Sequence, residues 1–228
     1  MDIQRIMDII TSIIDFFPVG FFLAASILVQ RDLYNKMSKG AFALFASGTI
    51  IVFVAGFTKA LHKIIFFTTG LNFYSLCALF FPMQTVGFVL AAVGLVAMCF
   101  YKQGEHKAYS FVLPALLPLL TTFKDKPDDS GKLTMVFVVL MCLGVFTMYG
   151  LLGFFSVKAK MWIPLVLLVV AFIGTLGMGY LSTKDELNDI IKESVNAIGQ
   201  GSFLAAAIIL HKKGLGKEDS LNGLLKAE

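Results

Sequence analysis

Charge is what this chain has least of. Of its 228 residues only 15% are charged, whereas 57% are hydrophobic, and the mean hydropathy is +0.83. Soluble domains carry about 25% charged and about 45–50% apolar residues. A soluble globular domain is therefore excluded, and the composition predicts one integral membrane domain with no separate soluble core.

Cysteines are also few, and none is placed for redox chemistry. Cys77, Cys99 and Cys142 lie inside apolar stretches, are odd in number and form no C-x-x-C pair. Cysteines in such surroundings are usually buried free thiols. The sequence therefore predicts neither a disulfide framework nor a thiol redox centre.

Familiar catalytic and cofactor signatures are missing. The chain has no H-E-x-x-H, no G-x-S-x-G and no Walker glycine loop. His62 is expected near one membrane face and His106 and His211 near the other, so the three histidines cannot form one metal site. We accordingly predict no catalytic residue, no metal site and no cofactor.

Apolar runs between charged breaks divide the chain into seven candidate spans. They cover residues 6–29, 41–63, 71–101, 108–123, 133–157, 161–181 and 190–210. A transmembrane helix needs about 20 apolar residues, so run 108–123 is the shortest and least certain to cross fully. The predicted fold class is all-α, a polytopic membrane bundle of seven helices over residues 1–213, followed by a short polar tail over 214–228.

Loop charges predict the orientation of this bundle. With seven spans, basic residues outnumber acidic ones on the side that carries the C-terminus, and acidic residues outnumber basic ones on the other. Cytoplasmic loops are enriched in Lys and Arg, which predicts an outside N-terminus and a cytoplasmic C-terminus in an inner or plasma membrane. Because the basic residues lie in short loops and set the orientation in the membrane, nucleic acid is not an expected partner.

One short pattern, G-x-x-L-A-A, occurs three times, at residues 20–25, 87–92 and 201–206. Small residues on one helix face let a neighbouring backbone approach closely, so helix packing is the simplest interpretation. An old internal duplication is the alternative. We expect these faces, and those carrying Gly144, Gly150 and Gly174, to point at other helices.

Polar side chains within the spans are the candidate site. Ionisable groups in a membrane are costly, so their presence suggests function. At about 1.5 Å per residue they all fall in the outer two-thirds of the bilayer. The predicted ligand-binding residues are Asp15, Lys59, His62, Gln84, Glu193, Asn196 and Gln200.

We expect these residues to line an outward-facing polar cavity. In it Lys59 supplies positive charge, Asp15 or Glu193 balances that charge, and the amides hydrogen-bond a small ligand. The competing interpretation is structural: Lys59, His62 and Lys63 snorkel to the surface, and Asp15 pairs with Lys59 as a packing device.

Three functions follow from these interpretations. The leading one is binding, with translocation, of a small polar or anionic solute. The first alternative is a non-catalytic sensor or accessory subunit that docks on another membrane protein or on a second copy of the chain. The third is a membrane-embedded enzyme acting on lipid, with Asp15 and Glu193 as paired carboxylates.

Overall fold

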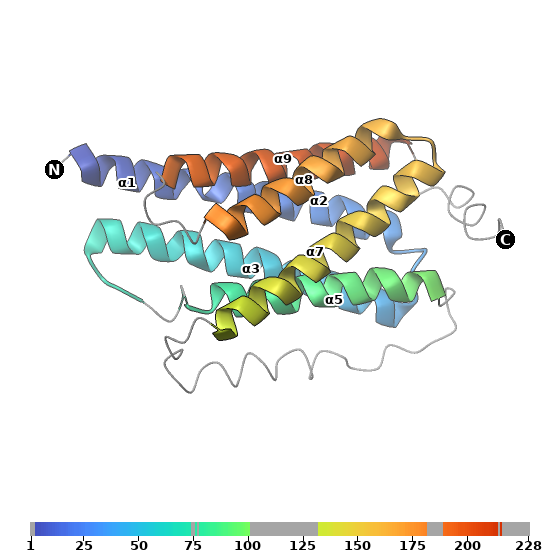
Figure 1. Ribbon diagram of the computed structural model, residues 1–228, viewed down its shortest axis with the longest axis horizontal. Helices are drawn as coiled ribbons and strands as arrows, with labels where there is room; N and C mark the ends of the chain where they lie inside the picture. Colours follow the sequence, from blue (N-terminus) through green and yellow to red (C-terminus); the bar gives the residue numbers. More distant parts are fainter. Residues whose placement is uncertain are drawn as a thin grey trace.

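A computed structural model describes residues 3–73, 76, 78–100, 132–181, 189–213 and 215 of the chain, without the side chains of residues 3–6, 132–135, 179–180 and 189. Within these ranges the chain is helical and contains no β-strand (Figure 1). The helices are α1 (Ile3–Ile14), α2 (Phe16–Leu33), α3 (Lys39–Thr69), α5 (Phe80–Phe100), α7 (Lys132–Lys158), α8 (Trp162–Leu181) and α9 (Asp189–Lys213).

Five helical stretches are long and apolar enough to cross a membrane. They are Met7–Leu33, Lys39–Thr69, Phe80–Phe100, Val136–Lys158 and Ile190–Lys213, and a shorter apolar stretch covers Trp162–Met178. The expectation of an all-helical protein is thus confirmed for the described residues, and the length and composition of these helices indicate a multi-pass membrane protein. The predicted run 108–123 and nearly all of the tail 214–228 lie outside them, so the count of seven spans stays a prediction.

Proline determines where α2 and α5 begin. Both helices start with Phe-Phe-Pro, and a proline has no N–H to donate to the carbonyl four residues earlier. Pro18 therefore cannot bond to Ile14, the last residue of α1, and Asp15 lies in the turn between α1 and α2. The predicted run 71–101 was wrong at its start, because residues 71–73 are not helical and α5 begins only at Phe80.

Glycines allow close packing in two antiparallel helix pairs, α3 with α5 and α8 with α9. A Cβ added to Gly48 of α3 would lie 2.5 Å from the backbone nitrogen of Ala91 in α5. A Cβ added to Gly174 of α8 would lie 2.7 Å from Cα of Gly199 in α9. The missing side chains let these backbones meet, as is common between helices in lipid.

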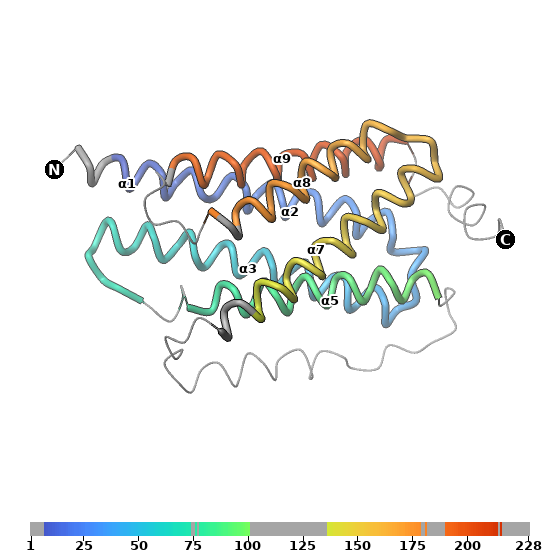
Figure 2. Tube along the Cα trace, viewed as in Figure 1, coloured from blue at the N-terminus to red at the C-terminus, as the bar shows by residue number. Residues whose placement is uncertain are grey.

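Helices α5 and α7 run in the same direction. Thr85 of α5 donates a 2.8 Å hydrogen bond to the carbonyl of Phe137, and Gly144 further along α7 packs against Phe88. The residue numbers of the contacting positions increase in the same direction along both helices. Helices α5 and α7 are therefore parallel, as Figure 2 shows. The chain therefore leaves α5 at one end of the bundle and enters α7 at the other.

The helices form two units with the same arrangement. The first is α2, α3 and α5, and the second is α7, α8 and α9. In each unit the second and third helices are antiparallel and meet through glycine. Across the units, α2 packs beside α9 and α5 beside α7, both in parallel (Figure 1). Each unit thus presents its first and third helices to the other unit.

The small-residue faces only partly behave as expected. Gly87 is buried against α3, and Gly144 and Gly174 also touch neighbouring helices. The expectation was wrong for Gly20 and Gly150, which have nothing within 4 Å of an added Cβ. The repeated pattern therefore does not give its glycines one common role.

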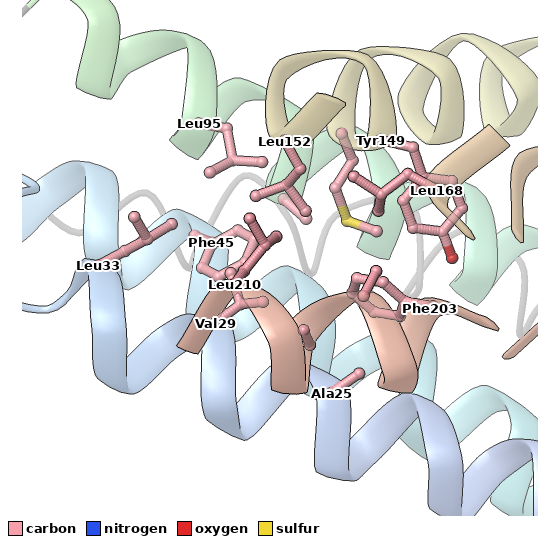
Figure 3. Packing of buried hydrophobic residues seen from close by; sticks show 14 of the residues in the cluster. Ala25, Val29, Leu33, Phe45, Leu95, Tyr149, Leu152, Leu168, Phe203 and Leu210 are labelled. Carbon is pink, nitrogen blue, oxygen red and sulfur yellow. The ribbon is translucent and has the colours of Figure 1, made fainter. Parts of the chain in front are cut away.

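An apolar core fills one half of the bundle. It occupies the half in which α2, α5 and α9 end and α3 begins, and its side chains come from α2, α3, α5, α7, α8 and α9. Figure 3 shows part of this packing. Its labelled members include Val29, Leu33, Phe45, Leu95, Tyr149, Leu152, Leu168, Phe203 and Leu210. The polar side chains predicted for the site lie toward the opposite half.

Replacing Gly48 by Ala should destabilise the protein, because the added methyl group meets backbone of α5 that cannot rotate away. We expect a loss of about 1–3 kcal/mol in unfolding free energy, measured by detergent-induced unfolding. Gly20→Ala is the matched control, since that position is open and alanine is the better helix former by about 1 kcal/mol. Equal stability of both variants would contradict the close α3–α5 contact.

Candidate functional site

A cavity of about 80 Å³ lies in the half of the bundle where α2, α5 and α9 begin and α3 ends. That volume exceeds the roughly 10–15 Å³ that one water molecule requires. Both helical units contribute to its wall. The polar lining residues are Asp15, Lys59, Gln84, Thr175, Glu193, Asn196 and Gln200, and the apolar ones include Phe22, Phe80, Phe88, Met141 and Met178.

A three-residue ion cluster stands at this cavity. The Lys63 Nζ atom lies 2.5 Å from Asp15 Oδ2 and 3.1 Å from Glu193 Oε1. The two carboxylate side chains are only 6% and 5% exposed, and that of Lys63 is 21% exposed. One ammonium group therefore bridges two buried carboxylates and joins α3 to α9 and to the junction of α1 and α2.

Local helix geometry places these groups. Asp15 occupies the turn that Pro18 imposes between α1 and α2. Glu193, Asn196 and Gln200 follow one another at spacings of three and four, so they share one face of α9. The amide of Asn196 donates to Glu193 Oε2 at 3.5 Å, a long contact that supports the carboxylate from its own helix.

Two buried acceptor atoms at the site lack a hydrogen-bond partner among the described residues. They are Asp15 Oδ1 and Gln200 Oε1, in residues that are 5% and 8% exposed. A buried acceptor without a donor costs about 1–3 kcal/mol. Both residues line the cavity, so the site as described offers more acceptors than it satisfies.

Lys59 lies one helical turn before Lys63, on the cavity wall. Its ammonium nitrogen is 4.3 Å from the centre of the Phe80 ring, a cation–π distance, and the residue is half-buried. Its place on the wall brings a second positive charge to the cavity.

His62 is the one predicted site residue that does not line the cavity. Its Nε2 atom is 3.2 Å from Asn72 Oδ1, and its ring stacks on Phe66. Consecutive residues on a helix point about 100° apart, so His62 cannot share the direction of Lys63.

The remaining six predicted residues lie around this one cavity, and a further lysine joins them. Lys63, which the sequence analysis left out of the predicted site, makes ion pairs with both Asp15 and Glu193. Sequence reasoning ended the second span at residue 63, whereas α3 continues to Thr69. The six further helical residues place Lys63 inside the helix, where its side chain reaches the carboxylates. The lysine spacing of four was the signal that both side chains share a face.

At the opposite end of the bundle, other charged groups join helices. His211 Nδ1 donates to Asp32 Oδ1 at 2.7 Å, and Arg31 donates to His211 Nε2 at 2.5 Å. Lys36 donates to the carbonyl of Leu215, which is buried. These contacts tie α2 and the loop after it to α9, far along the helices from the cavity.

Comparisons with protein-family models, curated proteins and solved structures find no match to this chain. Within the described part of the chain, no group of three or more His, Cys, Asp and Glu side chains is arranged to hold a metal ion. Function is therefore argued from the geometry of the cavity.

Replacing Lys63 by Met should strongly destabilise the bundle, because it leaves two buried carboxylates without their counter-ion. We expect a loss of about 3–5 kcal/mol in detergent-induced unfolding. The triple variant Asp15→Asn, Lys63→Met, Glu193→Gln should recover most of it, since no uncompensated charge remains. Lys212→Met, at an exposed position of α9, is the control. Wild-type stability of the Lys63 variant would contradict the bridging role.

Proposed function

We propose that the protein binds a small polar or anionic solute in this cavity and carries it across the membrane. The observation that supports the proposal is the gathering of charged and amide side chains from α3, α5, α9 and the α1–α2 turn around one hollow in a largely apolar bundle. Such groups are costly in lipid and commonly line substrate or ion pathways.

The cavity wall suits a solute with both donors and acceptors. Lys59 offers a positive charge, Gln84 and Asn196 offer amides, and Gln200 brings a buried acceptor that needs a donor. Phenylalanine and methionine side chains complete the wall and fit a short apolar portion. A volume of about 80 Å³ favours a small solute over a drug-sized one, which typically occupies about 300–1,000 Å³.

The arrangement of the helices supports translocation in addition to binding. Parallel structural repeats are common in transporters, with the substrate site at the interface between the repeats. Here α2, α3 and α5 match α7, α8 and α9 in order and direction, and the cavity is lined from both units. Rocking of one unit against the other is the motion that such an arrangement favours.

The same arrangement supports the seven-span topology. Because α5 and α7 are parallel, the chain between them crosses an odd number of times if both helices span the membrane. One crossing gives seven spans, and the loop charges then favour an outside N-terminus and a cytoplasmic C-terminus. In that orientation the cavity lies toward the outside of an inner or plasma membrane.

The alternatives have less support. A docking subunit needs small-residue faces for a partner, but Gly48, Gly87, Gly144 and Gly174 are used within the bundle, and of the glycines named above only Gly20 and Gly150 are open. A lipid-modifying enzyme needs carboxylates free to act on a substrate, whereas Asp15 and Glu193 both hold Lys63.

A thermal-shift panel tests solute binding. L-alanine, lactate, glycerol and glucose are added separately to purified protein, because they include a zwitterion, an anion and two neutral polyhydroxylated solutes of different size. A bound solute at about 100-fold its Kd stabilises by about 2.7 kcal/mol, so we expect at least one to raise Tm. Lys59→Ala and Glu193→Ala should fold but lose this shift, and Lys212→Ala should keep it.

The solute that raises Tm is then tested for uptake into proteoliposomes. Uptake by wild type and Lys212→Ala, without uptake by the two cavity variants, supports transport. The proposal fails if no solute of the panel stabilises the wild type, or if the cavity variants respond as the wild type does.

A further inference from the structure

Positive and negative charges at the cavity cancel. Asp15 and Glu193 line the cavity with carboxylates, and Lys59 lines it with an ammonium group. Lys63 contacts both acids, and Lys59 attracts Glu193 electrostatically. With all four groups ionised, two negative charges meet two positive ones. A solute with a net charge would bring an uncompensated charge into a largely apolar bundle, which is expensive, whereas a solute of zero net charge would not.

Two buried acceptor atoms on the wall favour a solute with strong hydrogen-bond donors. Asp15 Oδ1 and Gln200 Oε1 have no hydrogen-bond partner in the described part of the chain, and Lys63 contacts the other carboxylate oxygen, Asp15 Oδ2. A carboxylate oxygen makes its strongest hydrogen bonds with charged N–H groups. An ammonium group on the solute therefore suits Asp15 Oδ1, and the zero charge sum then favours a negative group on the same solute.

Donors for that negative group stand on the same wall. Lys59 Nζ lies 4.3 Å from the centre of the Phe80 ring, and Gln84 brings an amide from α5. A solute carboxylate beside Lys59 would share its ammonium with Glu193. Lys59 need not be vacant for this, because Lys63 shows that one ammonium group here contacts two carboxylates.

Apolar side chains restrict the rest of the solute. Phe22, Phe88, Met141 and Met178 belong to the lining, and the volume of the cavity is about 80 Å³. Hydrophobic and aromatic walls of this kind hold the apolar part of a ligand, while a few polar groups fix its orientation. The cavity therefore suits a short, uncharged side chain.

We propose that the solute is a small zwitterionic amino acid, whose ammonium group donates to Asp15 Oδ1 and whose carboxylate lies beside Lys59. The inference rests on the proposed solute-binding function and selects one class among polar and anionic solutes. Binding of such a solute adds one positive and one negative charge, so the charges at the cavity still sum to zero.

Four solutes with one carbon skeleton test this assignment. L-alanine carries both charges, L-lactate only the negative one, L-alaninamide only the positive one, and L-lactamide neither. Binding to the purified full-length chain is measured by isothermal titration calorimetry in near-neutral buffer. We expect L-alanine to bind about tenfold more tightly than each of the other three, or better, because each of them lacks at least one charged contact.

Charge changes in the wall test where each end of the solute lies. Lys59→Met leaves an excess negative charge and should shift the preference from L-alanine toward L-alaninamide. Asp15→Asn leaves an excess positive charge and should shift it toward L-lactate. We expect each ratio of dissociation constants to change about tenfold. Lys212→Met removes one positive charge from an exposed position of α9 and should keep the wild-type preference.

The outcomes separate this inference from the proposed function. A wild-type preference for L-alanine, with opposite shifts in the two cavity variants, supports the zwitterion. If another member of the series binds as tightly as L-alanine, or if glycerol or glucose binds and L-alanine does not, the inference is overturned while solute binding stands. An unaltered preference in either cavity variant also overturns it. Failure of every solute to bind contradicts both proposals. Size-exclusion profiles establish folding, and the wild-type series decides alone if neither variant folds.

Discussion

The bridge from Lys63 to two buried carboxylates is the interaction on which the rest of the structure depends. In an apolar bundle neither Asp15 nor Glu193 is stable as a lone charge, and the ammonium of Lys63 contacts both. Satisfying this bridge draws the end of α3 against α9 and against the α1–α2 junction. The polar half of the bundle is therefore a consequence of charge pairing, as the other half is a consequence of apolar packing.

Composition alone predicted a membrane protein. With so few charged residues, the chain cannot cover its many apolar residues with a polar surface, so lipid has to surround part of them. Six cavity residues were predictable for a similar reason, since a polar group within a span has to face something other than lipid. The pairing of Lys63 with Asp15 and Glu193 was not. It depends on where α3 ends, and apolar runs do not reveal that a helix continues past its charged residues to Thr69.

Helix directions and contacts were harder still to predict. The pattern G-x-x-L-A-A suggests equivalent faces, yet Gly87 is buried against α3 while Gly20 touches nothing. Small residues permit close packing but do not choose a partner. The similarity of the two units is accordingly visible in the order and direction of their helices, and not in a repeated stretch of sequence.

A single geometric idea connects these features: two three-helix units meet around a hydrophilic hollow whose charges hold them together. The lysine bridge lies where the units touch, the unsatisfied acceptors of Asp15 and Gln200 are at the same hollow, and the apolar core fills the other half. The proposed transport function would use both parts: the packed apolar core and the cavity beside the ion pairs of Lys63.

The most direct test is whether water reaches Gln84 from outside the cell. In a variant without its natural cysteines, Gln84→Cys is treated in intact cells with a small, charged, membrane-impermeant methanethiosulfonate, and Leu95→Cys in the packed core of the same helix is the reference. The account requires fast modification at position 84 and none at 95. Equally slow modification at both positions would contradict it.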